Sequence, residues 1–379
     1  MSATPDHRDT HHTLEVKRVR LLAAIALFAG LGFIVALPFA LRAGAEFFLP
    51  VTAALVIAIA LVPLLEWLER HRFPSWLASL TSLILFIAFA SFVIASIVLP
   101  AIDWFALVPE RIERVTTTLA PFIDFYTAIE DFLDSTLGRF DMSANDTVQV
   151  ETPNSLLDLL TSSAPRVLIQ IFFATLLIFF FLAGWTAMRE RTITSRGSFE
   201  GALTTARVIG EVVDSTSTYI ATITFVNLSL GAVTAVVLWA LGMDSPIMWG
   251  GIVAVLNFIP YLGPIAASLL LGLGGLMTFV DPWAALLPPL VFVGLHTVEA
   301  NLITPMLVGK RVHISPLLIL LSLSFWAWIW GTTGALLAIP LLIIIKTVFA
   351  AAGTPDIAGF LFEDGTLTHI GEDDEKGDG

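Results

Sequence analysis

The sequence predicts an all-α polytopic integral membrane protein, because it is too apolar for a soluble domain and its hydrophobic stretches have the length of membrane spans. Its 379 residues are 56% hydrophobic and only 13% charged, whereas soluble domains carry about 25% charged residues. A helix needs about 20 apolar residues to cross a bilayer. We expect about six to eight transmembrane helices, with two broken or re-entrant helical hairpins in the C-terminal third.

The charge balance argues against a nucleic-acid partner and for a lipid one. The net charge is −13, and the acids gather in one internal segment and in the C-terminal tail, as solvated surface does. Ten Trp and 28 Phe suit a surface that faces lipid, with aromatic anchors at the interface. The chain contains no cysteine, which excludes disulfides and thiol catalysis.

Five uninterrupted apolar stretches come first along the chain. The first is uncharged for 21 residues, longer than the roughly 7–15 of a signal-peptide core, so we interpret it as a retained helix. Some of the turns between these stretches carry basic residues, and the positive-inside rule assigns those turns to the cytoplasm. It assigns both termini to the same side. The predicted helices cover residues 21–41, 47–65, 76–99, 167–181 and 219–241.

The segment 103–166 differs from its neighbours because it holds eleven acids against four arginines. Counting crossings places it outside the cytoplasm. Phe122, Phe125, Ile129 and Phe132 recur at spacings of three and four, which predicts an amphipathic helix. Such a helix lies on the membrane or against a neighbouring subunit; the alternative is a lid or a vestibule that attracts cations. The expected regions are a tail (1–20), helices 1–3 (21–102), this segment (103–166), a transport core (167–350) and an acidic cytoplasmic tail (351–379).

Two apolar stretches, 245–277 and 315–345, each open on Ser-Pro and are each broken near the middle. Breaks expose backbone groups that survive in hydrocarbon only when buried in protein or lining a water-filled cavity. Transporters use such breaks to bind solutes at mid-membrane depth; the alternative is a close helix crossing through small residues. The residues that break the helices are Pro260, Gly263, Pro264, Gly331, Gly334 and Pro340, and the polar residues beside them are Asn257, Tyr261, Thr332 and Thr333.

Three topologies fit these stretches. Single long crossings would give eight helices and place Lys310 and Arg311 outside, against the charge rule. Hairpins entering from opposite faces place both residues, and Lys346, inside. Each arm has about 15 residues, or roughly 22 Å of helix, which suits half a membrane. Ten short crossings would give the same sidedness, so charge alone leaves them open.

Glu299 is the main candidate for an ion- or proton-coupling group. It lies on the hydrophobic segment between the two broken stretches, with His296 one turn earlier and Asn301 close by; Asn227 is the strongly polar residue inside the fifth helix. Ionisable residues inside the membrane are costly and are functional candidates by default. The alternative is a neutral Glu299 that pins its helix by hydrogen bonds.

Enzyme chemistry finds little support. The chain has no Gly-x-x-x-x-Gly-Lys-Ser/Thr phosphate loop, no His-Glu-x-x-His and no Gly-x-Ser-x-Gly motif. The pair His296 and Glu299 lacks the second such pair that a di-metal bundle uses. We therefore expect a protein that is not an enzyme and has no metal and no cofactor.

Two motifs carry a family resemblance. NFIPYLGP (257–264) and EANLITPMLVGKRVHISP (299–316) resemble the AI-2E family of bacterial membrane proteins, the autoinducer-2 exporters and PerM-type permeases. The likeness extends more weakly from about residue 30 to 350; segment 103–166 and the tail acids 372–375 depart from it. It implies an inner-membrane transporter that exports a small solute such as autoinducer-2 or exchanges Na⁺ or Li⁺ for H⁺. It also implies a homo-oligomer, with a pentamer as one form.

We therefore expect a secondary-active exporter of a small polar solute, coupled to protons or another ion. The first alternative is a Na⁺(Li⁺)/H⁺ antiporter. The second, of another class, is an oligomeric channel or scaffold without coupled transport. Saturable flux that depends on a pH gradient would distinguish the transporters from a channel.

Overall fold

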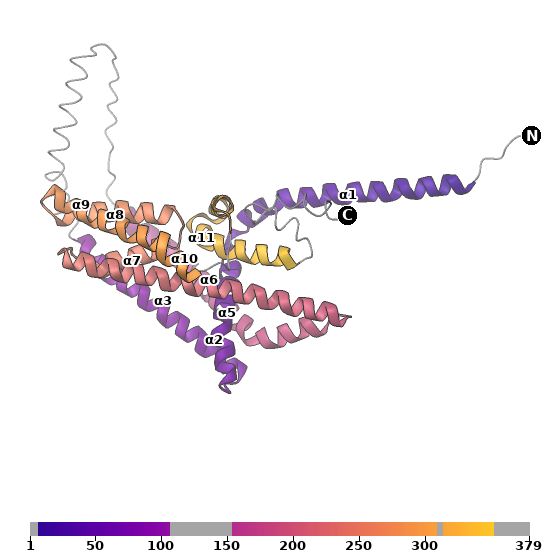
Figure 1. Cartoon of the computed structure of the whole chain (residues 1–379), viewed down its shortest axis with the longest axis horizontal. Coiled ribbons are helices and arrows are strands. Elements are labelled where there is room, and N and C mark those ends of the chain that lie inside the picture. Colours follow the sequence, from indigo (N-terminus) through magenta and orange to yellow (C-terminus); the bar gives the residue numbers. More distant parts are fainter. Residues whose placement is uncertain (1–6, 107–153, 309–313, 352–379) are drawn as a thin grey trace, which may run out of the picture.

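A computed structural model describes residues 7–106, 154–308 and 314–351, and every regular element in these ranges is helical (Figure 1). The amphipathic pattern of segment 103–166, residues Lys310 and Arg311, and the acidic tail lie almost wholly outside the described residues. The helices are α1 (His7–Ala43), α2 (Ala45–Arg70), α3 (Ser75–Ala106), α5 (Asn154–Thr194), α6 (Phe199–Ala240), α7 (Pro246–Leu256), α8 (Leu262–Thr278), α9 (Pro282–Val298), the π-helix η1 (Glu299–Ile303), α10 (Thr304–Val308) and α11 (Pro316–Ala351).

The described residues contain seven helical stretches long and apolar enough to cross a membrane, and two shorter apolar helices, α7 and α8. This confirms the predicted all-α polytopic class. Several helices are longer than predicted: α3 runs through Pro100 to Ala106, α5 covers Asn154–Thr194, and α6 begins at Phe199. Proline is tolerated inside membrane helices because neighbouring groups satisfy the freed carbonyl. Ser198 begins α6 by accepting a hydrogen bond from the Gly201 amide at 3.1 Å.

The core of the first half lies where α2, α3 and α5 pack against one another. Small side chains on α2, such as Ala54 and Ala58, are fully or almost fully buried there. Small residues let helix backbones approach closely in a membrane, where van der Waals packing and not water exclusion holds helices together. α5 contributes Leu182 and Trp185 to the same cluster.

α6 and α7 cross at a pair of glycines. A Cβ on Gly231 would lie 2.4 Å from the carbonyl oxygen of Gly250, and a Cβ on Gly250 would lie 2.3 Å from the carbonyl oxygen of Gly231. The two backbones are therefore in direct contact, as small-residue motifs allow. This contact fixes α7, and hence the first break, against the long α6.

The first broken stretch is a helical hairpin. α7 and α8 pack antiparallel, because a Cβ on Gly274 near the end of α8 would meet the ring of Trp249 at the start of α7. The turn between them passes through Pro260 and Tyr261, and Tyr261 adopts a left-handed φ of 63°. With 11 residues in α7 and 17 in α8, both arms are shorter than a full span of about 20 residues.

The second broken stretch also folds back on itself. Trp330 and Gly331 leave helical geometry, with φ of 62° at Gly331. The Ser322 hydroxyl donates to the Ala338 carbonyl at 2.9 Å, although these residues would be roughly 24 Å apart in a straight helix. α11 is therefore a hairpin of two arms, which excludes one straight crossing. The predicted pair of broken helical hairpins is confirmed.

The tip of this second hairpin contacts the end of α1. Trp330 Nε1 donates to the Leu41 carbonyl at 3.1 Å, and the Arg42 guanidinium lies 4.8 Å from the centre of the Trp328 ring. Beyond this contact α1 projects from the rest of the bundle (Figure 1). Its apolar window has no buried residue, which leaves this span available to lipid or to another subunit.

Candidate functional site

The first break and the Glu299 segment share one cavity of about 600 Å³. Its polar lining comes from two places that are far apart in the sequence, the α7–α8 turn and the junction of α9 with η1 and α10. Apolar side chains from α6, α8 and α11 complete it. The lining residues are Tyr219, Ile223, Asn257, Pro260, Tyr261, Pro264, Ile265, His296, Glu299, Ala300, Thr304, Ile314, Ile319 and Ile339.

Glu299 is the central acid of this cavity and is only 5% exposed. The Thr304 hydroxyl donates to its Oε1. His296 Nδ1 lies 3.0 Å from its Oε2, an ion-pair distance when the imidazole is protonated, although the ring nitrogen does not meet the angle of a good hydrogen bond. The carboxylate is thus held by groups that suit both a charged and a protonated form.

The helix around Glu299 changes pitch where the acid lies. The Thr304 amide bonds to the Glu299 carbonyl five residues back, which makes one turn of π-helix. π-turns are rare and occur frequently at functional sites. The preceding α9 is anchored at its start by Asp281, whose side chain accepts from the Ala284 amide at 3.2 Å. The buried Phe292 ring stacks against His296, with centroids 5.9 Å apart.

Asn257 links the first break to both Glu299 and α6. Its Nδ2 donates to Oδ1 of Asn227 at 2.9 Å, and its side chain lies beside the Glu299 carboxylate in the same cavity. Asn227 is fully buried and does not line the cavity. A chain of polar groups therefore runs from α6 through the break to the acid, and it fixes the position of the non-helical backbone.

The structure brings together Glu299, His296, Asn257 and Tyr261, with Pro260 and Pro264 in the same wall. The other candidates lie elsewhere. Asn301 is exposed, and its amide donates to the Thr297 carbonyl at 2.8 Å. Thr332 and Thr333 are also exposed at the tip of the α11 hairpin, outside the cavity lining.

Two polar lining residues, Tyr219 and Thr304, are not among the sequence candidates. Tyr219 on α6 gave no signal because an aromatic residue at the start of an apolar stretch is common in membrane helices. Thr304 is five residues from Glu299, and on an α-helix that spacing turns two side chains about 140° apart. Only the π-turn brings its hydroxyl to the carboxylate.

This arrangement can carry out reversible ion or proton binding. A carboxylate, a hydroxyl and amide oxygens supply hard ligands for a small cation, and a buried acid beside an imidazole can exchange a proton. Among the described residues no group of three or more His, Cys, Asp or Glu side chains could hold a metal ion. The cavity volume lies in the usual range for small-molecule sites, about 300–1,000 Å³.

Comparison with known proteins agrees with this architecture. The profile of the AI-2E family transporter matches residues 21–353. The chain belongs to the AI-2E transporter family. Among its relatives, the AI-2 transport protein TqsA of Escherichia coli (strain K12) is 27% identical over 352 residues, which cover 91% of this chain and 98% of TqsA. A Haemophilus influenzae (strain ATCC 51907 / DSM 11121 / KW20 / Rd) protein is 24% identical over 344 residues, or 87% of this chain and 93% of its own length.

Shorter likenesses fall within the same family. PerM of Escherichia coli (strain K12) is 36% identical over 61 residues, which is 16% of this chain and 17% of PerM. Family and helices together make this AI-2E protein an integral membrane transporter. The α7–α8 break and the Glu299 cavity both lie inside the matched range.

Proposed function

We propose that this AI-2E transporter is a secondary-active exporter of a small polar solute of the autoinducer-2 kind, coupled to protons or another ion through Glu299. The observation that carries the proposal is the position of Glu299, a buried acid in a cavity that the non-helical turn of a broken hairpin also lines. Broken helices beside a buried acid are how secondary transporters bind solute and coupling ion at one place.

Three features support a polar solute as the cargo. Asn257 and Tyr261 present an amide and a phenol to the cavity, which are suited to hydroxyl-rich molecules. The Tyr261 side chain is half exposed, at 51%, so it can contact a ligand without losing existing contacts. The name of TqsA, a relative matched over nearly its whole length, refers to AI-2.

A Na⁺(Li⁺)/H⁺ antiporter is the second candidate, favoured by the oxygen atoms around Glu299. The carboxylate, the Thr304 hydroxyl and the Asn257 side chain converge there, and hard cations prefer oxygen ligands. In that case the alkali ion and the proton would compete for one acid. The two candidates differ in cargo and share Glu299.

The proposal includes orientation and assembly. The positive-inside rule applied to Arg189, Arg191 and Arg196 places the α5–α6 turn in the cytoplasm, with both termini on the same side of a bacterial inner membrane. We further propose a homo-oligomer, for which the apolar and unburied α1 offers a surface.

Reconstitution into proteoliposomes tests the coupling. We expect saturable counterflow of autoinducer-2, or of Na⁺ or Li⁺, that responds to a pH gradient. Glu299→Gln keeps the size of the side chain and removes its ionisation, so counterflow or binding is expected to persist while the response to the gradient disappears. Glu211→Gln, on the exposed side of α6, is the matched control. An unchanged gradient response in Glu299→Gln would rule out the coupling role.

A further inference from the structure

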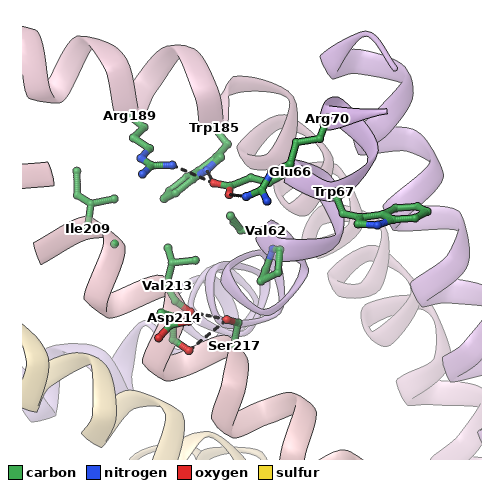
Figure 2. A pocket seen from close by; sticks show the side chains of 12 residues that line it. Val62, Glu66, Trp67, Arg70, Trp185, Arg189, Ile209, Val213, Asp214 and Ser217 are labelled. Carbon is green, nitrogen blue, oxygen red and sulfur yellow. Dashed lines mark hydrogen bonds and ion pairs between the residues drawn. The ribbon is translucent and has the colours of Figure 1, made fainter. Parts of the chain in front are cut away.

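A second pocket, of about 420 Å³, lies between α2, α5 and α6 and shares no lining residue with the Glu299 cavity. Figure 2 shows its side chains from close by. Its floor is apolar and its rim is charged. The residues that line it are Val62, Pro63, Glu66, Trp67, Arg70, Trp185, Arg189, Ile209, Gly210, Val213, Asp214 and Ser217.

One side of the pocket carries two arginines around one acid. Arg189 Nη1 donates to Glu66 Oε1 at 3.0 Å, and Arg70 Nη2 lies 3.5 Å from Glu66 Oε2. Each guanidinium has five N–H donors in a planar fork, so these contacts leave donors for a ligand. The trio carries one net positive charge. Arginine forks match phosphate oxygens in geometry as well as in charge.

The other side of the pocket carries an acid. Asp214, on α6, lies across the pocket from Arg189 and Arg70 in Figure 2. The neighbouring Ser217 hydroxyl donates to the Val213 carbonyl at 2.6 Å, so the carboxylate is the group there that attracts a cation. The pocket thus has a positive end and a negative end, and its four charged residues sum to zero.

The pocket also lies where lipid headgroups are found. α2 ends its apolar span at Arg70, and Trp67 on its last turns is 55% exposed. Exposed tryptophan and arginine at the end of a span mark the membrane interface. The apolar floor of Val62, Val213 and Trp185 can receive the glycerol end of a lipid while the rim holds its headgroup.

We propose that this pocket binds a zwitterion that carries a phosphate and a primary ammonium group, the chemistry of the phosphatidylethanolamine headgroup. The phosphate contacts Arg189 and Arg70. The ammonium contacts Asp214. A phosphate diester without an amine would not satisfy the negative end of the pocket, because it lacks a cation. A trimethylated amine would not satisfy that end either, because it has no N–H donors.

Native mass spectrometry of the purified full chain from mixed nanodiscs tests the proposal. With equal amounts of phosphatidylethanolamine, phosphatidylcholine and phosphatidylglycerol, we expect about tenfold preference for the first, since charge-assisted hydrogen bonds supply that order of discrimination. Asp214→Asn is expected to abolish the preference over phosphatidylglycerol, and Glu211→Gln, outside the pocket on the same helix, to keep it.

A pocket-filling variant avoids disturbing the ion pairs. Gly210 lines the pocket, and a Cβ there meets no atom within 4 Å. We expect the Gly210→Met side chain to occupy the pocket and release the lipid. Gly184→Met is the matched control, since Gly184 on α5 also has open space and does not line the pocket. The proposal is overturned if Gly210→Met retains phosphatidylethanolamine. It is also overturned if the unchanged chain retains all three lipids equally. Free phosphoethanolamine that displaces the lipid at similar concentration assigns the same site to a soluble ligand.

Discussion

Asn227 and Asn257 show how single side chains hold non-helical backbone inside a membrane protein. The fully buried Asn227 accepts a hydrogen bond from Asn257, and Asn257 also contacts Glu299. Because Asn257 is the last residue before the turn of the first hairpin, this amide pair fixes where α7 ends relative to α6. We therefore expect the position of Glu299 to depend on Asn227, which does not line the cavity.

Asn227→Leu tests this dependence. It keeps a similar volume and leaves the Asn257 amide without its acceptor, so we expect a loss of about 1 kcal/mol, the scale measured for hydrogen bonds between membrane helices. Thermal unfolding in detergent measures it. Solute counterflow should fall together with the stability of this variant. Ser229→Ala is the control, since the Ser229 hydroxyl bonds to the Phe225 carbonyl within α6. Equal stability and equal counterflow in both variants would contradict the positioning role.

Most of the polar lining of the cavity could be predicted from the sequence at the residue scale. Glu299, His296, Asn257 and Tyr261 each stand out as polar or aromatic groups beside a helix break in an apolar stretch. Thr304 could not be found, because its contact depends on a π-turn that α-helical periodicity does not encode. Thr332 and Thr333 do not line this cavity, because the tip of the α11 hairpin lies at the end of α1, where Trp330 donates to the Leu41 carbonyl.

At the scale of elements, glycines set how closely the hairpin arms approach. A Cβ on Gly263 would lie 1.9 Å from the Leu256 carbonyl oxygen, and one on Gly334 would lie 2.0 Å from the Trp326 carbonyl oxygen. In both hairpins a glycine just after the break thus packs on the last turn of the first arm. The two stretches share this device although their sequences differ.

Gly263→Ala should open the first hairpin. The added methyl group has no space, and the backbone of α8 must move, so we expect a loss of about 1–3 kcal/mol in the free energy of unfolding, as for other overpacked sites. Gly272→Ala is the matched control, because its Cβ meets only Pro289 at 3.9 Å; it should be neutral or stabilising by up to about 1 kcal/mol. If Gly263→Ala were as stable as Gly272→Ala, the close approach of Gly263 to the Leu256 carbonyl would not constrain the turn.

The helix boundaries show where sequence reasoning stops at the element scale. Apolar stretches predicted the spans well, because hydrocarbon thickness fixes their length. They underestimated α5, which extends to Thr194, and they gave no sign that the helix predicted over residues 201–218 is continuous with the fifth span in α6. Polar residues with good helix propensity continue a helix into water, and hydropathy alone does not detect this.

At the scale of the whole molecule, the two hairpins predict a definite sidedness. The chain has no cysteine, so each single-cysteine variant carries one thiol. We expect Gly197→Cys in the α5–α6 turn and Ser315→Cys at the start of α11 to react with an impermeant maleimide from the cytoplasmic face. Val280→Cys, 72% exposed between α8 and α9, should react from the opposite face. Labelling of Gly197→Cys and Ser315→Cys from different faces would refute two hairpins of opposite entry.

The π-turn at Glu299 has a consequence for insertions and deletions. A π-turn holds one residue more than an α-turn, so the side chains after Ile303 are displaced by about 100° from the positions that α9 alone would give them. Without the π-turn and with no change of length, Thr304 would lie about 140° around the helix from Glu299. Removal of one residue from this turn would instead leave the two side chains four residues apart on one face of an unbroken α-helix. A one-residue deletion here should therefore keep the Thr304–Glu299 contact, whereas a one-residue insertion should break it.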